Sequence, residues 1–302
     1  MKWSLATVMT AGFGLLGACP LRAAEAGAEH EGLSLTAQAI VTLFQGTPLE
    51  FPITNSMIVA WVAAALIILV VQLGTRRMTF VPGKLQNFVE WLVESLRDFL
   101  EGLVGPQLAR EGFWFFASVF IFILTANWFG LLPGVGDIGW GHQTASGFKV
   151  TAPLLRGANA DINMTMSLAM LFTLMWVVWS LRMRGAAGVL RHLFVAPVEM
   201  KGFMLFMMGA IFLMVGTIEV FQIMVVRPLA LTLRLYGNIY AGENLMETLL
   251  SFPYGGWIAA VLGYFMELLV GLVQALVFML LSAVFTLLMC QHEEHGEPGA
   301  AH

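Results

Sequence analysis

Charged residues are scarce in this 302-residue chain, at 11% of the sequence against 59% hydrophobic residues. Soluble domains carry about twice that share of charge, so the composition predicts an integral membrane protein. The chain has only 15 Lys and Arg residues and no basic stripe. The sequence therefore also disfavours a nucleic-acid-binding role.

Cysteines are few, and a phosphate-binding loop is missing. The two cysteines, Cys19 and Cys290, lie at opposite ends of the chain, which does not support a disulfide framework or a cysteine metal site. No glycine-rich loop followed by Lys and Ser or Thr occurs, so a nucleotide site is not expected. We expect neither a cofactor nor a metal in this chain.

The N-terminus has the pattern of a secretory signal peptide. A lysine precedes an uncharged run over residues 5–18, and small residues follow at 24–26. We predict a signal segment over residues 1–26 and an external segment over residues 27–55. Two alternatives stay open: a lipoprotein-type cleavage site at Cys19, and an uncleaved first membrane helix, for which the run is short against about 30 Å of hydrocarbon.

Long apolar runs, uncharged except in the region 203–250, predict about five membrane-spanning helices. The runs cover 56–75, 113–132, 163–181, a very long region over 203–250, and a final pair, 248–266 and 268–290, separated by Glu267. We expect an all-α membrane domain over residues 56–290 and a charged tail over residues 291–302.

Arginine clusters orient these runs. Arg76-Arg77 and the cluster from Arg182 to Arg191 lie two spans apart, and positive residues prefer the cytoplasmic side of a membrane. We predict that the N-terminus and the loop 133–161 are outside and that the tail is cytoplasmic.

Residues 83–104 have a different pattern. Leu85, Phe88, Leu92 and Leu96 recur at helical spacing, and charged residues occupy much of the remainder. This pattern predicts an amphipathic helix on the cytoplasmic membrane surface. It is either a plain interfacial anchor or a docking surface for a partner.

The region 203–250 is too long for one upright span, because a continuous helix would measure about 70 Å. We expect a tilted helix pair with a kink at Pro228, which removes a backbone donor. Arg234 lies in this apolar region, where a permanent cation costs roughly 2.5–3.5 kcal/mol on insertion scales. Such a residue faces a polar cavity, a counter-charge or an ion path. The alternative is snorkelling to the headgroups, which we expect of Arg227.

Helical spacing sorts the polar residues near Arg234. Asn238 follows it by four residues and shares its face, whereas Glu243 falls on the opposite side at about 100° per residue. Glu267 and Gln274 share one face of the last helix. We expect the Glu243 face to pack against the Glu267–Gln274 face, with Arg234 pointing elsewhere. Two carboxylates in one wet crevice would share protons, as in a proton relay; alternatively, they join two helices by polar contacts.

The run Arg-Leu-Tyr-Gly-Asn-Ile-Tyr-Ala-Gly-Glu over residues 234–243 resembles the signature of subunit a of F-type ATP synthases. Other motifs that resemble this family lie at 82–90, 126–134, 161–165 and 274–278. Subunit a is a membrane stator beside a rotating ring of c subunits, and the two together form two half-channels for protons.

The resemblance implies roles for particular residues. Arg234 would be the charge gate that faces the c-ring carboxylate and blocks direct leakage between the half-channels. Glu219 would lie on the cytoplasmic route, although its spacing to Arg234 is one residue longer than the family pattern implies. A polar set would line the non-cytoplasmic half-channel: Asn238, Glu243, Glu267 and Gln274.

Two departures from the family pattern concern protonation. Many relatives pair a histidine with a carboxylate where this chain has Glu243 and Glu267, which implies a different protonation balance along the same path. Tyr236 stands where phenylalanine is more usual, which adds a hydroxyl.

Together these observations predict the proton-translocating stator subunit of a rotary ATP synthase in a bacterial inner membrane. The subunit itself would not be an enzyme. Its expected partners are the c-subunit ring, the b-subunit peripheral stalk and the rest of the F1Fo complex, with Na+ as an alternative coupling ion. A secondary ion-coupled transporter is the main alternative function, and a structural membrane scaffold is a third. Inverted repeats would support a transporter, and we find no convincing internal repeat.

Overall fold

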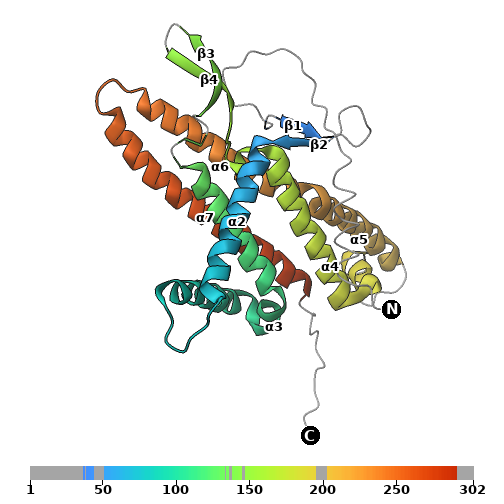
Figure 1. The fold of residues 1–302 in the computed structure, drawn as a ribbon. Coiled ribbons are helices and arrows are strands. Elements are labelled where there is room, and N and C mark those ends of the chain that lie inside the picture. The colour runs from blue at the N-terminus through green and yellow to red at the C-terminus, as the bar shows by residue number, and fades with distance from the viewer. Residues whose placement is uncertain are drawn as a thin grey trace. The chain divides into compact units, whose positions relative to one another are not determined.

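The computed structural model describes residues 37, 39–43, 51–132, 134, 135, 138–144, 147–194 and 203–290. In this part of the chain, five helical stretches are long and apolar enough to cross a membrane (Figure 1). The predicted all-α membrane domain is thus confirmed in class, with two short hairpins added to it. The predicted signal segment and the charged tail lie outside the described residues.

The two hairpins are antiparallel and flank the first two long helices. Strand β1 (Ala39–Leu43) pairs with β2 (Phe51–Thr54), and β3 (Gly139–Thr144) pairs with β4 (Gly147–Pro153). Helix α2 (Asn55–Thr75) follows β2 directly, and the Nδ2 of Asn55 donates to the carbonyl of Pro153 at 2.9 Å. This bond ties the end of the second hairpin to the start of α2.

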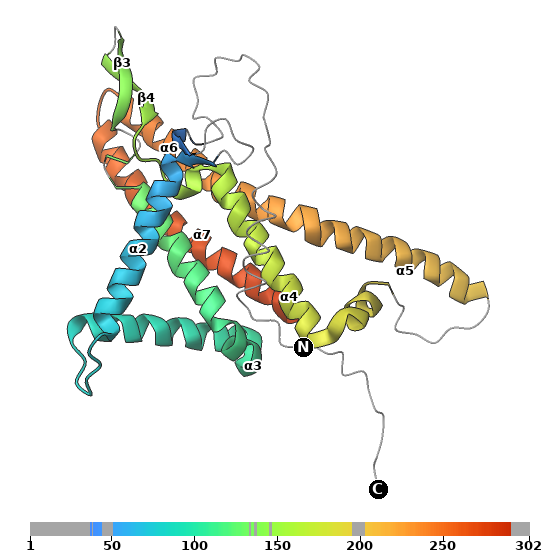
Figure 2. The same ribbon diagram turned by 45° about the vertical axis from the view of Figure 1, so that its right-hand side comes forward.

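Helix α3 (Lys84–Gly130) contains the predicted amphipathic segment and the second span in one sequence. The two parts meet at Gly105, whose φ of 79° is a conformation that favours glycine, and Pro106 follows. Figure 2 shows the first part lying across the end of α2 and the second part running steeply away from it. The predicted surface helix and the predicted span are therefore both present, separated by this bend.

The long region 203–250 is broken, as predicted, but by a different device from a simple proline kink. Helices α5 (Phe203–Phe221) and α6 (Arg227–Leu250) are joined by a π-helical turn, η2 (Gln222–Val226). The N–H of Arg227 bonds to the carbonyl of Gln222, five residues earlier. Pro228 has no N–H for the carbonyl of residue 224, and the wider turn lies directly before it.

Helix α4 (Ile162–Phe194) follows the short 3-10 helix η1 (Ala158–Ala160), and α7 (Gly256–Cys290) ends the described chain. The final apolar runs belong to α7, which continues through Glu267, and the turn lies before it at 251–255. Helices α3, α4 and α7 supply most of the buried core, to which η2 and α6 add Ile223, Leu231 and Leu235. Aromatic contacts join the three helices. Phe115 meets Trp179 edge-on at 5.4 Å, and Phe172 meets Phe278 at 6.4 Å between ring centroids.

Candidate functional site

Arg234 lies on the exposed side of α6. The helix buries Leu231 and Leu235, while Leu233 and Arg234 remain exposed. Among the residues that the structure describes, no carboxylate lies within ion-pair distance of Arg234. A permanent cation on a largely apolar face needs a counter-charge or water, because burial of an unpaired charge is costly. The arrangement fits a cation that meets a partner outside this chain.

A polar seam joins α6 to α7 beside this cation. The Nδ2 of Asn238 donates to the Oε1 of Gln274 at 2.6 Å. One turn further along α6, a Cβ built at Gly242 would overlap the carboxyl group of Glu267. The absence of a side chain at Gly242 is therefore what leaves room for the Glu267 carboxyl between the two helices.

The face of α6 that makes these contacts differs from the predicted one. We expected the Glu243 face to meet Glu267 and Gln274, with Arg234 pointing elsewhere. The described contacts instead come from Asn238 and Gly242, which lie four and eight residues after Arg234 and so on its stripe. The reason is steric, since only the glycine next to Glu243 allows the Glu267 carboxyl this close. The sharing of a proton by the two glutamates stays a prediction.

Asparagine side chains hold the polar part of α7 in position. The Nδ2 of Asn127 on α3 donates to the carbonyl of Gly271 at 3.1 Å, and the Nδ2 of Asn159 donates to the Oδ1 of Asn127 at 2.7 Å. The Nε1 of Trp128 donates to the carbonyl of Leu268 at 3.1 Å. Sequence reasoning assigned these residues no role, although the motif 126–134 was a signal of their importance.

Glu219 and Arg227 lie on either side of the π turn. Arg227 follows Glu219 by eight residues. Because a π turn holds about one residue more than an α turn, these eight residues make about two full turns of the helix. They therefore lie on the same face of the helix. The extra residue between Glu219 and Arg234 is thus accommodated by the π turn.

Arg227 packs its guanidinium against α7, and the snorkelling expected of it stays a prediction. Its Cζ lies 4.2 Å from the centroid of the Phe285 ring on α7, and its Nε is buried. A guanidinium over an aromatic face is attracted by the ring quadrupole. Arg227 therefore ties the start of α6 to α7, which is a structural role for this second arginine.

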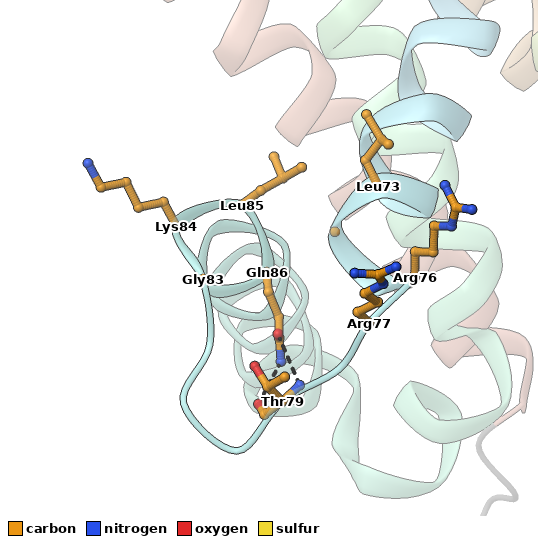
Figure 3. A pocket seen from close by; sticks show the side chains of 9 residues that line it. Leu73, Arg76, Arg77, Thr79, Gly83, Lys84, Leu85 and Gln86 are labelled. Carbon is orange, nitrogen blue, oxygen red and sulfur yellow. Dashed lines mark hydrogen bonds between the residues drawn. The ribbon is translucent and has the colours of Figure 1, made fainter.

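A hollow of about 390 Å³ lies at the corner between α2 and α3 (Figure 3). Arg76, Arg77 and Lys84 line it, together with Gln86, whose Nε2 donates to the carbonyl of Thr79 at 3.2 Å. None of the predicted proton-path residues lines this hollow. It is a basic corner of the predicted cytoplasmic side and lies outside the site around Arg234.

Comparison with known proteins gives consistent matches over most of the chain. The profile of the family described as "ATP synthase A chain" matches residues 57–286. A protein of Gloeobacter violaceus named "ATP synthase subunit a" is 30% identical over 232 residues, covering 76% of this chain and 81% of its own length. Proteins of the same name from Shewanella amazonensis and Solidesulfovibrio magneticus are 31% and 30% identical, covering 74% and 77% of this chain and 80% and 83% of their own lengths.

Proposed function

The chain belongs to the family of ATP synthase A chains, and from this premise we propose that it is the proton-translocating membrane subunit of a rotary ATP synthase. It is a multi-pass membrane protein with five helical stretches of spanning length in its described part. The alternative of a secondary transporter is not favoured, because the family match covers nearly the whole membrane domain.

The observation that carries the proposal is the exposed cation on α6 beside the α6–α7 seam. A carboxylate of a neighbouring ring subunit that comes within about 4–6 Å of Arg234 would be held in its ionised form, because the opposite charge favours that form. A fixed cation also repels a proton in transit. Arg234 would thereby release the proton from the ring on one side and prevent direct passage between the two half-channels.

The polar residues around the cation supply the two routes. We assign Asn238, Gln274, Glu243 and Glu267 to the non-cytoplasmic half-channel. Amide and carboxyl groups of facing helices can hold a chain of water between them. Glu219, beyond the π turn, is assigned to the cytoplasmic route.

The placement of partners follows from the surfaces of the chain. We assign the exposed apolar side of α5 and α6 to the c-subunit ring, and the peripheral b subunits and the F1 part complete the complex. ATP chemistry belongs to those partners, and this chain conducts ions. The chain lies in the bacterial inner membrane with its N-terminus outside and its C-terminus in the cytoplasm.

The test of the proposal is Arg234→Ala in the assembled complex. We expect ATP-driven acidification of inverted membrane vesicles to fall to the background, with or without an increased passive leak. Arg97→Ala, which removes an exposed arginine from the surface part of α3, is the matched control and should pump normally. Subunit content of the complex is measured in parallel. Normal pumping by an assembled Arg234→Ala complex would exclude the gate role.

A further inference from the structure

Tyr236 on α6 carries a buried hydroxyl. Its residue surface is 8% exposed, and its Oη has no hydrogen-bond partner among the described residues. A buried polar atom without a partner is costly, and a buried tyrosine usually finds one for its hydroxyl. Phenylalanine, the more usual residue by resemblance to the family, would fill the same space without this cost. Packing alone therefore does not explain the hydroxyl.

The hydroxyl belongs to a polar stripe along α6. Tyr240 and Glu243 follow Tyr236 by four and seven residues, so the three side chains share one face of the helix. The rings of Tyr236 and Tyr240 stack, with centroids 6.1 Å apart and planes inclined by 17°. This stripe is distinct from the stripe of Arg234 and Asn238, which meets α7.

Two buried charged residues flank a short helix that packs against α6. The helix is η1, which lies between Arg156 and Asp161. Arg156 is 5% exposed and Asp161 is 1% exposed. Arg156, Asp161, Tyr240 and Glu243 all lie close enough to Tyr236 for their charges to affect the pKa of its hydroxyl, after the effect of its burial. A phenol in the middle of such a set can exchange protons with groups on both sides.

Asp161 is fixed by the helices around it. The Oγ of Ser56 on α2 donates to its Oδ2 at 2.7 Å, and the N–H of Asn163 donates to its Oδ1 at 3.0 Å. Arg156 and Asp161 end the segment 133–161, which we predict to lie on the non-cytoplasmic side. The cluster therefore lies toward the side from which protons would reach Glu243.

We propose that the Tyr236 hydroxyl passes protons between the Arg156–Asp161 cluster and Glu243, as a second polar route into the non-cytoplasmic half-channel. This inference rests on the proposed function. In each transfer, Oη accepts a proton from water on the outer side and releases its own proton to water on the side of Glu243. One O–H bond forms as the other breaks, so the tyrosine returns to its neutral form and only the proton has moved.

The experiment compares passive proton conduction through the membrane sector after removal of F1 from vesicles, driven by an imposed potassium potential. Tyr236→Phe keeps the ring and removes only the hydroxyl. We expect it to lower the conduction rate roughly three- to tenfold, as the loss of one hydrogen-bonded transfer step implies. Tyr254→Phe, which removes the hydroxyl of a tyrosine that is 95% exposed in the turn before α7, is the matched control and should conduct normally.

A second measurement separates proton passage from packing. Because the hydroxyl has no described partner, Tyr236→Phe should leave the unfolding temperature of the complex unchanged or raise it, and Tyr236→His should restore part of the lost conduction. Unchanged conduction in Tyr236→Phe overturns the inference. A loss of conduction that Tyr254→Phe matches, or that a lowered unfolding temperature accompanies, overturns it too. If the unmodified complex conducts no protons, the proposed function fails. If it conducts and Arg234→Ala stops ATP-driven pumping while Tyr236→Phe has no effect, only this inference fails.

Discussion

The helix pair α5–α6 and the bundle of α3, α4 and α7 are both apolar, yet they bury very different shares of their residues. In the most apolar stretch of 207–250, 11% of the residues are buried within the chain. The corresponding stretches of α3 and α7 bury 44% and 39% of their residues. The bundle uses its apolar side chains to pack against itself. The pair leaves most of its apolar side chains for lipid or for another subunit.

The same comparison separates two uses of polar residues. In the bundle, polar side chains such as Asn127 and Asn159 bond to each other and to backbone carbonyls. On the pair, Arg234 is exposed on the largely apolar side. Hydrophobicity alone therefore does not tell a structural span from a functional one; burial and the partners of the polar groups do.

The largest effect on stability should come from removing a buried side chain of the bundle. Phe278 is completely buried and meets Phe172 edge-on, so Phe278→Ala should lower the free energy of unfolding by roughly 3–5 kcal/mol. Leu213→Ala on α5, where the side chain is 60% exposed, should change it by less than about 0.5 kcal/mol. Unfolding of the detergent-purified subunit, followed by tryptophan fluorescence, measures both.

The sharper form of this test uses the assembled complex. If α5 faces a partner, Leu213→Ala should weaken association with that partner while leaving the isolated subunit intact. Equal destabilisation of the isolated subunit by the two changes would show that the contrast between bundle and pair is wrong.

An intermediate effect is expected from the seam where the two regions meet. Gly242→Ala would push the Glu267 carboxyl away from α6, and proton transfer requires hydrogen-bond reach, so passive conduction should fall by roughly an order of magnitude. A Cβ added by Gly237→Ala on the same helix meets no atom of the described residues within 4 Å. This substitution should raise the unfolding free energy of the subunit by about 0.5–1 kcal/mol, as expected for glycine replaced in a helix. Normal conduction by Gly242→Ala would remove Glu267 from the proton path.

The sequence predicted the spans, the amphipathic helix and the polar residues of the seam because each rests on local periodicity. The side of α6 that contacts α7 was predicted less well. Packing between helices depends on where a small residue permits close approach, and here Gly242 leaves room for the Glu267 carboxyl. The π turn could not be predicted from hydropathy. The spacing from Glu219 to Arg234, one residue longer than the family pattern implies, was the sequence feature that indicated it. The two hairpins were missed, since short strands in connecting segments have no strong sequence pattern.

A change in stability smaller than that of Phe278→Ala, and the test that most sharpens the comparison, concerns two arginines seven residues apart on α6. Arg227 stacks on Phe285 of the bundle, so Arg227→Gln should lower the unfolding free energy of the subunit by roughly 0.5–2 kcal/mol. Arg234 has no such contact within the described chain, so Arg234→Gln should leave stability unchanged and stop pumping. Chemical unfolding and ATP-driven acidification, measured on both variants, give the two readouts. If Arg227→Gln stops pumping without loss of stability, the charge of Arg227 belongs to the ion path. The assignment of Arg227 as a structural cation and Arg234 as a functional one would then be wrong.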